Sequence, residues 1–299
     1  MLRVPISKAR SGMVLALPIY HPNQPARALL RSGVTLEART ILRLRENGVR
    51  IVYVRYPGLE LLDSFIDPKL IEERAGLTQA ITAGFEEVAR TAVAPRDFDQ
   101  YRRRVAALLE RITNNRRAAL FVDELAEASD PLLEHSASVC FLALLLGIEL
   151  ESYLVRERPR LSPQIASDPA PLGLAGLLHD IGVAALDPEV RQRFDETGDE
   201  TDPAWREHTR LGYELIRNEV ETSVAAAVLN HHQHWDGSGF PTHRQYGRPP
   251  ISPAGSKIHV FSRVICAADL FNRLRREPSN AENAGEGTSR GVCVPVVRA

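Results

Sequence analysis

The chain has 299 residues, of which 44% are hydrophobic and 25% are charged. This is the composition of a globular protein, and the length is enough for two domains of ordinary size. The 37 basic and 38 acidic residues leave a net charge of −1, so the chain as a whole has no positive field to attract DNA, RNA or an anionic membrane.

The cysteine pattern and the apolar runs bear on the compartment. Cys140, Cys266 and Cys293 are widely spaced and form no CxxC pair, which is typical of a reducing environment. The N-terminus lacks the apolar core of a signal peptide. No run reaches the roughly 18–20 apolar residues that cross a bilayer. We therefore expect a cytoplasmic protein without a membrane span.

Residues 1–57 predict a small α+β domain. MVLALPIY (13–20) and ALLRSG (28–33) are typical of short strands separated by a proline-rich turn. TLEARTILRLRENG (35–48) predicts a helix with Thr35 as its N-cap and Gly48 as its stop. RIVYVRY (50–56) predicts a further strand. A connector and a helix are expected over residues 58–100.

The remainder predicts an all-helical bundle over residues 101–277, so the expected fold class is mainly α. Apolar residues recur at three- and four-residue spacing in YRRRVAALLERI (101–112) and RAALFVDELAEA (117–128). Further helices are expected near 131–150, 172–186, 203–219, 222–234 and 256–276. RERPRLSPQIASDPAP (156–171) is expected to be a loop, and the tail 278–299, poor in apolar residues, is expected to be disordered.

Several titratable side chains interrupt the apolar faces of these helices. His135 shares one face with Val139, Leu142 and Leu146, and the other helices repeat the pattern. The set is His135, His179, Asp180, His208, His231, His232 and Asp269. A single histidine on an apolar face is more often a core residue than a ligand, but here five helices each contribute at least one such group.

The two carboxylates decide between these interpretations. A buried aspartate without a positive partner costs several kcal/mol or takes up a proton. Asp180 and Asp269 have no Lys or Arg on the same inward face, so a metal would supply the missing charge for both. Imidazoles mixed with carboxylates suit iron, manganese or zinc rather than magnesium or calcium. Seven ligands are too many for one tetrahedral ion, and we therefore expect at least two divalent metals.

Four motifs in order, LLHDIG, HTRLG, HHQHWDGSGFP and ICAADLFNRL, resemble the HD-GYP subgroup of the HD-domain metallohydrolases over about residues 120–276. The segments SGMVLA, LLRSGVTL and ENGVRIVYV are similar to a small domain often found before HD-GYP domains. The resemblance implies an all-helical bundle with two or three metals, often iron. It also implies hydrolysis of cyclic di-GMP to pGpG or GMP, and signalling partners such as GGDEF-domain proteins.

The resemblance implies that the seven residues above are the metal ligands, with Asp180 bridging two metals and helping to activate water. Members with three metals carry a Glu where this chain has Pro131. Glu134 would project about 100° from His135 on a helix, so a two-metal centre is expected. Val183 stands where the family has a substrate-contacting Lys.

Further departures fall in the signature and after it. HHQHWDGSGFP has Gln233 in place of a Glu and Phe240 in place of a Tyr. Arg275 or Arg276 are candidates to bind a phosphate, with solvated charge as the alternative, and Trp235 either stacks on a guanine or packs against the turn. The signature loop comprises Asp236, Gly237, Gly239, Phe240 and Pro241. Asp236 is either a hydrogen-bond acceptor for a ligand imidazole or only the first residue of an Asp-Gly turn.

Three functions are compatible with these residues. The first is a metal-dependent cyclic di-GMP phosphodiesterase. The second is a degenerate HD-GYP module that binds a nucleotide or a partner protein without turnover. The third is an HD hydrolase acting on another phosphoester, or a metal centre with redox chemistry, because fold alone does not select a reaction.

Overall fold

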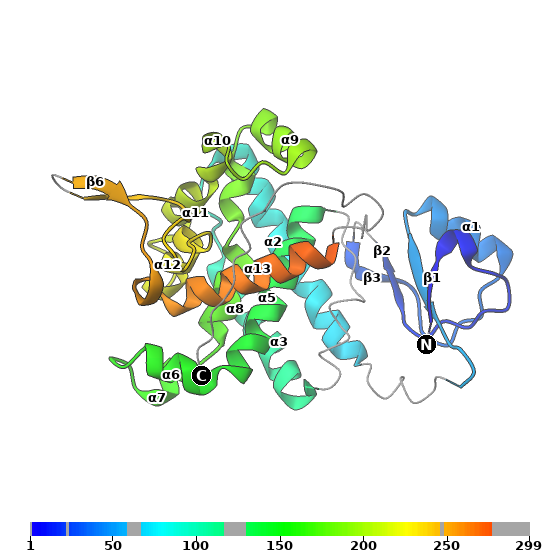
Figure 1. The fold of residues 1–299 in the computed structure, drawn as a ribbon. Helices are drawn as coiled ribbons and strands as arrows, with labels where there is room; N and C mark the ends of the chain where they lie inside the picture. Colours follow the sequence, from blue (N-terminus) through cyan, green and yellow to red (C-terminus); the bar gives the residue numbers. More distant parts are fainter. Residues whose placement is uncertain (1, 22–23, 59–66, 117–129, 246–247, 277–299) are drawn as a thin grey trace, which may run out of the picture. The chain divides into compact units, whose positions relative to one another are not determined.

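The computed structural model describes residues 2–21, 24–58, 67–116, 130–245 and 248–276 (Figure 1). The chain divides into two compact units, one formed by residues 1–83 and 103–134 and the other by residues 84–102 and 135–299. Helices α2 (Pro68–Thr91) and α3 (Phe98–Asn114) contribute residues to both units. The domain boundaries expected at residues 57 and 100 therefore stay predictions. The helix expected over 117–128, Cys293 and the tail 278–299 lie outside the described residues.

The first unit contains the expected small α+β arrangement. Strand β1 (Leu2–Pro5) pairs antiparallel with β4 (Ile51–Val54), and β2 (Ile19–His21) pairs antiparallel with β3 (Gln24–Leu30). Helix α1 (Ala38–Glu46) follows the second pair, and a single 3-10 turn, η1 (Ile6–Lys8), follows β1. Buried aliphatic side chains from β1, η1, β2, α1, β4 and the segments between elements form one core, against which Leu29 and Leu30 of β3 pack: Val4, Ile6, Leu15, Ile19, Leu36, Leu44, Val49, Val52 and Val54.

Two expectations for this unit were wrong. Strand β1 was missed, and helix α1 begins after Glu37 rather than after Thr35. Thr35 is unavailable as a cap because its backbone forms a β-bridge with Val14. Such a long-range pairing has no signal in the local sequence. Gly48 follows the helix with φ +79°, a conformation that favours glycine.

The second unit is mainly helical, as expected. Its main helices are α5 (Pro131–Glu149), α6 (Glu151–Glu157), α8 (Ala170–Leu178), α9 (Pro188–Thr197), α11 (His208–Ile216), α12 (Thr222–Asn230) and α13 (Val260–Arg276). Shorter elements are α7 (Pro163–Ser167), α10 (Pro203–Arg206), η3 (Ile181–Ala185), η4 (Gly255–Lys257) and the hairpin β5 (His243–Gln245) with β6 (Arg248–Ile251).

Three helices of this unit begin by the same local device. Helices α7, α9 and α10 have Pro in the first turn, preceded by Ser162, Asp187 and Asp202, respectively. Each of these side chains accepts a hydrogen bond from a backbone N–H of the first turn, which satisfies a donor that has no partner within the helix. The segment 156–171 therefore contains helix α7 rather than only a loop.

The helix expected over 172–186 is broken in the middle. Helix α8 ends at Leu178, and η3 begins at Ile181. His179 and Asp180 lie at this break, and the backbone of Asp180 leaves the helical region with φ −103° and ψ 15°. The apolar run continues across the break, so periodicity alone did not reveal it. The expected helix 203–219 is likewise divided, into α10 and α11.

Close helix packing brings these elements together. Helix α8 contacts α12 and α13, and α11 contacts η3 and α12. Gly176 of α8 faces the backbone of α5, where a Cβ would lie 2.9 Å from the carbonyl oxygen of Val139. The absence of a side chain at Gly176 therefore lets α8 approach α5, which brings His179 close to His135.

Helix α5 is long and apolar enough to cross a membrane, contrary to the expectation from the sequence. In the structure 61% of its most apolar window is buried, and core helices of soluble proteins meet the same criteria. A bent pair formed by residues Pro163–Ala185 and Pro188–Thr197 also meets them together, with a bend of 115°. These criteria concern length and composition alone.

Candidate metal centre

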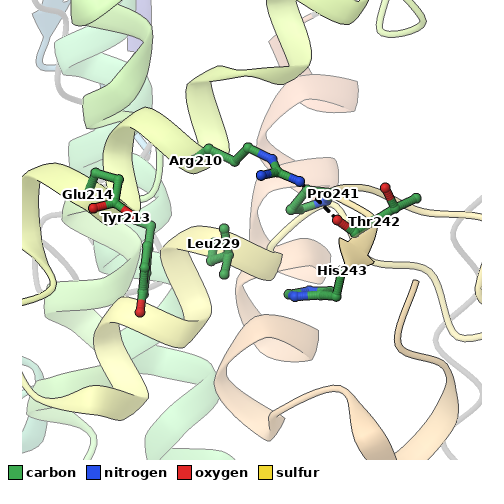
Figure 2. A pocket seen from close by; sticks show the side chains of 7 residues that line it. All are labelled: Arg210, Tyr213, Glu214, Leu229, Pro241, Thr242 and His243. Atoms are coloured by element: carbon green, nitrogen blue, oxygen red, sulfur yellow. Dashed lines mark hydrogen bonds between the residues drawn. The ribbon is translucent and has the colours of Figure 1, made fainter. Parts of the chain in front are cut away.

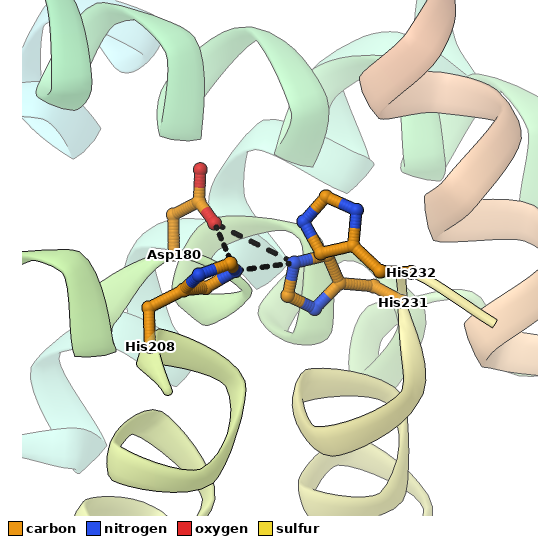
Figure 3. A group of neighbouring side chains, drawn as sticks. All are labelled: Asp180, His208, His231 and His232. Atoms are coloured by element: carbon orange, nitrogen blue, oxygen red, sulfur yellow. Dashed lines mark hydrogen bonds and ion pairs between the residues drawn. The ribbon is translucent and has the colours of Figure 1, made fainter. Parts of the chain in front are cut away.

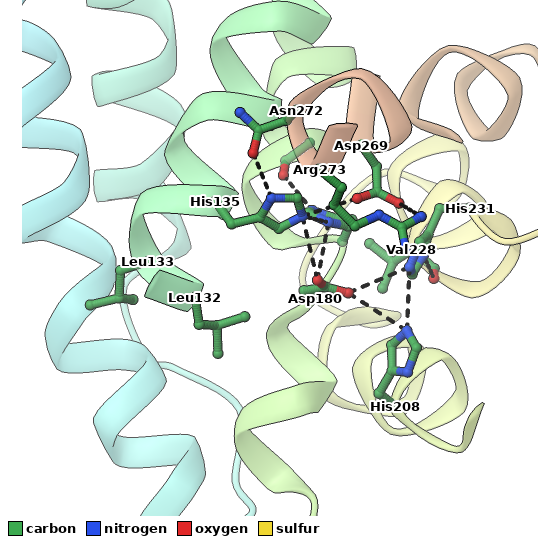
Figure 4. Close-up of polar contacts among 12 residues, drawn as sticks. Leu132, Leu133, His135, Asp180, His208, Val228, His231, Asp269, Asn272 and Arg273 are labelled. Carbon is green, nitrogen blue, oxygen red and sulfur yellow. Dashed lines mark hydrogen bonds and ion pairs between the residues drawn. The ribbon is translucent and has the colours of Figure 1, made fainter. Parts of the chain in front are cut away.

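The seven side chains singled out in the sequence lie together in two groups. The first group is Asp180, His208, His231 and His232 (Figure 3). The second is His135, His179 and Asp269, and Figure 4 shows His135 and Asp269 beside Asp180 and His231. Within each group one ligand atom from every residue lies within 4.8 Å of the others. Six of the seven residues are buried, and Asp180 is nearly so.

The hydrogen bonds of three histidines determine which ring nitrogen carries the proton. In His179, His208 and His231, Nδ1 lies 2.8, 2.7 and 2.8 Å, respectively, from the carbonyl oxygen three residues earlier. A carbonyl oxygen only accepts, so the hydrogen is on Nδ1 in each ring. In a neutral imidazole the other nitrogen, Nε2, then presents a lone pair. The local helical geometry therefore turns three lone pairs toward the centre of the site.

These lone pairs face one another. Nε2 of His208 lies 3.4 Å from Nε2 of His231, and Nε2 of His179 lies 3.3 Å from Nε2 of His135. Two acceptors at this distance repel each other unless a cation lies between them. A metal with ligands at about 2.1 Å places neighbouring ligand atoms about 3.0–3.4 Å apart, so the observed spacing fits a metal ion in each group.

Asp180 connects the two groups. Its Oδ1 lies 3.6 and 3.5 Å from Nε2 of His208 and His231. Its Oδ2 lies 3.3 and 3.8 Å from Nε2 of His179 and His135. Oδ1 is buried and has no hydrogen-bond partner within the described parts of the chain. Each carboxylate oxygen therefore faces one group, which is the arrangement of a carboxylate that bridges two ions.

The pKa shifts of the clustered residues also point to a site that would be stabilised by positive charge. Burial lowers the pKa of His208 to about 4, and the neighbouring imidazoles act in the same direction, so this ring is neutral at pH 7. Burial also lowers the pKa of His232. Burial would lower the pKa of His179, but the carboxylates of Asp180 and Asp269 outweigh burial and raise it. Burial would raise the pKa of Asp180, but His179 and the other imidazoles outweigh burial and hold this pKa well below its usual range.

Two residues of α13 complete the second group, and the sequence reasoning missed both. Asn272 Oδ1 lies 2.8 Å from Nδ1 of His135 and orients this ring as the carbonyls orient the others. Arg273 donates from Nη2 to Oδ2 of Asp269 at 2.8 Å, while Oδ1 of Asp269 lies 3.0 Å from Nε2 of His135. Asp269, Asn272 and Arg273 share one face of α13 at i, i+3 and i+4, a spacing that could have revealed them.

Arg273 corrects the expectation that no cation shares the inward face of Asp269. Burial would raise the pKa of Asp269, but Arg273 and then His135 outweigh it and hold this pKa well below its usual range. Asp269 is therefore ionised with an arginine as its partner. Asp180 and the facing imidazole nitrogens, rather than Asp269, therefore indicate a metal.

Replacing Asn272 tests its role in orienting His135. We expect Asn272→Leu to weaken metal binding about 10- to 100-fold, because the Nδ1–H of His135 loses its acceptor and the ring loses its fixed tautomer. Asn272→Asp keeps an acceptor and is expected to retain most of the affinity. Titration of the metal-free variants with manganese measures both constants. Equal affinities for Asn272→Leu and the wild type would contradict the role.

The signature loop folds back onto the end of α12. Phe240 is buried, and its ring stacks on His232 with centroids 4.5 Å apart and planes 17° apart. Gln233 donates from Nε2 to the carbonyl oxygen of Pro241 at 2.6 Å. Gly239 permits this return, because a Cβ there would lie 2.3 Å from the carbonyl oxygen of His232. The residues that depart from the family signature thus hold the loop and the His232 ring in place.

The structure also places the other side chains that the sequence singled out. Asp236 accepts from the backbone N–H and the hydroxyl of Ser238, at 2.9 and 2.7 Å, so it forms the turn and does not support a ligand imidazole. Gly237, the next residue, has φ +84°. Trp235 is 46% exposed and faces Arg263, with the guanidinium carbon 5.7 Å from a ring centroid. The guanidinium of Arg275 lies over Phe271, and the side chain of Arg276 lies outside the described residues.

Gly182 positions His208 by letting η3 approach α11. A Cβ at Gly182 would lie 1.9 Å from the carbonyl oxygen of His208 and 2.5 Å from the backbone nitrogen of Gly212. Backbone atoms cannot move aside without displacing the helix, so we expect Gly182→Ala to destabilise the protein by about 3 kcal/mol or more. Gly212→Ala, where the nearest atom is a Val228 methyl at 3.1 Å, should cost less. Chemical denaturation measures both, and equal costs would contradict this packing.

A pocket lies on another face of α11 (Figure 2). It has a volume of about 320 Å³ and is lined by Arg210, Tyr213, Glu214, Leu229, Pro241, Thr242 and His243. Arg210 donates to the carbonyl oxygen of Thr242 at 3.0 Å (Figure 2). Arg210 is two residues from His208, which places the two side chains on opposite faces of the helix. None of the seven clustered residues lines this pocket.

Comparison with known proteins agrees with the site. Residues 165–287 match the model of the family described as "HD domain". The chain is 29% identical over 165 residues to a cyclic di-GMP phosphodiesterase of Pseudomonas aeruginosa, covering 52% of this chain and 34% of that protein. It is 28% identical over 104 residues to the cyclic di-GMP phosphodiesterase response regulator RpfG of Xanthomonas campestris, covering 34% of this chain and 25% of that protein.

A solved structure is also similar. It is described as an HDG"Y"P protein from Bdellovibrio bacteriovorus, with a TM-score of 0.46 and 14% sequence identity over 92% of this chain and 88% of that chain.

Residues 165–287 of the second unit thus match an HD domain. Over part of its length the chain is also similar to cyclic di-GMP phosphodiesterases. The chain matches about a third or less of the length of each of these two relatives.

Proposed function

We propose that this protein is a metal-dependent phosphodiesterase that opens cyclic di-GMP to pGpG or GMP at a two-metal centre. The observation that carries the proposal is the Asp180 carboxylate, whose two oxygens face two separate sets of imidazoles. The names of the two phosphodiesterase relatives supply the substrate. We further propose that the protein acts in the cytoplasm, where GGDEF-domain proteins are candidate partners.

The proposed ligands are divided between two ions. His208, His231 and His232 would hold one ion, and His135, His179 and Asp269 would hold the other, with Asp180 between them. Iron is our first choice, with manganese or zinc as alternatives, because imidazoles with carboxylates suit these metals. When bound, two such ions supply positive charge at a phosphoryl oxygen and make a water acidic enough to attack phosphorus near neutral pH.

The chain's own residues orient these ligands. The backbone carbonyls hold His179, His208 and His231 with Nδ1 protonated, so that each presents Nε2 without rearrangement. Phe240 fixes the plane of His232 by stacking. A site with its donors already fixed loses little orientational freedom on binding metal.

The test is incubation of protein loaded with iron or manganese with cyclic di-GMP, followed by chromatography of the products. We expect pGpG or GMP to form in a metal-dependent reaction. No product from a preparation that carries two metals per chain would contradict the proposed activity.

A second candidate, a module that binds a nucleotide without turnover, is favoured by one observation. Val183 is buried with 6% exposure at the position where the family resemblance implies a substrate-contacting lysine. A buried valine supplies no charge to a phosphate. Tight binding of cyclic di-GMP by the metal-loaded protein, without product, would support this second function.

A further inference from the structure

The rim of the metal centre carries an arginine that is not in the family signature and is held by two carboxylates. Arg273 lies on α13 beside Asp269 (Figure 4), and its other terminal nitrogen, Nη1, contacts Glu200. Glu200 comes from the segment between α9 and α10, far from Arg273 in sequence. The two contacts are different in kind, because Asp269 is 4% exposed and Glu200 is 41% exposed.

This difference shows which partner of Arg273 can be exchanged. Asp269 is a buried carboxylate that contacts both Arg273 and His135, so breaking its pair with Arg273 would leave a buried charge without its cation. The Arg273–Glu200 pair lies in partial contact with solvent, where ion pairs contribute little to stability. In addition, Nε of Arg273 is buried and has no hydrogen-bond partner in the parts of the chain that the structure describes.

Another arginine near the site, Arg206, already has its own partners. Arg206 donates from Nε to the backbone carbonyl of Glu200 at 2.7 Å, and its guanidinium carbon lies 4.8 Å from the centre of the Phe240 ring. Phe240 in turn stacks on His232. Arg206 thus holds the backbone of Glu200 beside the signature loop, while the side chain of Glu200 reaches Arg273.

We propose that Arg273 binds a phosphate group of the substrate, and that the Glu200 carboxylate occupies this position until a phosphate replaces it. The inference deepens the proposed function, on which its choice of substrate rests. A guanidinium binds a phosphate by two parallel charge-assisted hydrogen bonds, which are stronger than one half-exposed ion pair. Arg273 would therefore supply the charge that Val183 cannot, from a different helix.

The test compares four single substitutions in the full-length, manganese-loaded protein. Arg273→Gln removes the proposed phosphate ligand, and Arg217→Gln removes an exposed arginine whose Nε lies 2.8 Å from Glu214 Oε2, away from the metal centre. Glu200→Gln removes the competing carboxylate. Glu196→Gln removes an exposed carboxylate of α9 that accepts a hydrogen bond from Gln192. Calorimetry measures the affinity for inorganic phosphate and for cyclic di-GMP, and elemental analysis measures the metal content.

We expect Arg273→Gln to weaken phosphate binding about tenfold or more, because a charged hydrogen bond is lost. Glu200→Gln should tighten phosphate binding about two- to fivefold, which corresponds to the strength of an exposed ion pair such as Arg273–Glu200. Both controls should match the wild type, and all four variants should keep the wild-type metal content. These changes are expected for inorganic phosphate alone, whether or not cyclic di-GMP is the natural substrate.

Three results would overturn the inference. Arg273→Gln could bind phosphate as tightly as Arg217→Gln. Alternatively, Arg273→Gln could lose metal in proportion to phosphate affinity, in which case Arg273 only supports Asp269. Finally, Glu200→Gln could bind phosphate no better than Glu196→Gln. By contrast, a wild-type protein that binds phosphate through Arg273 but neither binds nor cleaves cyclic di-GMP would contradict the proposed function and leave the phosphate site standing.

Discussion

Replacing Asp180 by Asn is expected to abolish hydrolysis of cyclic di-GMP while leaving the protein folded. The Asp180 carboxylate faces both sets of imidazoles, and an amide offers one acceptor oxygen instead of two. We expect the bound metal to fall from two ions per chain to one or none. The rate should fall about a thousandfold or more, because two bound ions contribute several kcal/mol to stabilising the transition state.

The fold should survive because the new amide removes a buried charge and its NH₂ can donate to a facing imidazole nitrogen. Circular dichroism of the metal-free protein checks this point. The matched control is Asp236→Asn, which changes an exposed carboxylate of the neighbouring turn. Asp236→Asn should keep both ions and the activity. An Asp180→Asn protein with two ions and wild-type turnover would refute the bridging role.

Removing the metals is expected to lower the melting temperature by about 8–16 °C. At a free metal concentration of about 1,000 times its dissociation constant, binding to the folded state contributes about 4 kcal/mol. Each kcal/mol corresponds to about 2–4 °C in a domain of 150–250 residues. The cause is local, because without cations the Nε2 atoms of His208 and His231 face each other as two acceptors.

The measurement is differential scanning calorimetry before and after treatment with a chelator, with metal added back. Restoration of the melting temperature by manganese would exclude damage by the chelator. Asp180→Asn should show a much smaller response than the wild type. Equal melting temperatures for the metal-loaded and metal-free wild type would contradict a structural contribution from the centre.

The sequence located the seven clustered side chains because each interrupts an apolar helix face, and such faces point inward. His208 and His231 are examples, since both lie in line with buried apolar residues. Asn272 and Arg273 were missed because a polar residue near the end of a helix is usually solvated. Their role depends on how α13 packs beside α5, and this packing has no counterpart in the local pattern.

Other errors have the same origin in tertiary structure. The apolar run around His179 continues through the break between α8 and η3, so periodicity predicted one helix. Thr35 has the side chain of a good N-cap, but its backbone pairs with Val14 instead. The sequence allowed two roles for Asp236, and its hydrogen bonds from Ser238 show that it forms the turn.

We propose that two ions share the Asp180 carboxylate. Anomalous X-ray diffraction from crystals of the iron- or manganese-loaded protein tests this arrangement most directly, because the signal comes from the metals alone. We expect two peaks, one between Asp180 and the imidazoles of His208, His231 and His232, and the other between Asp180 and the side chains of His135, His179 and Asp269. A single peak that contacts only one oxygen of Asp180, or no peak among these residues, would contradict it.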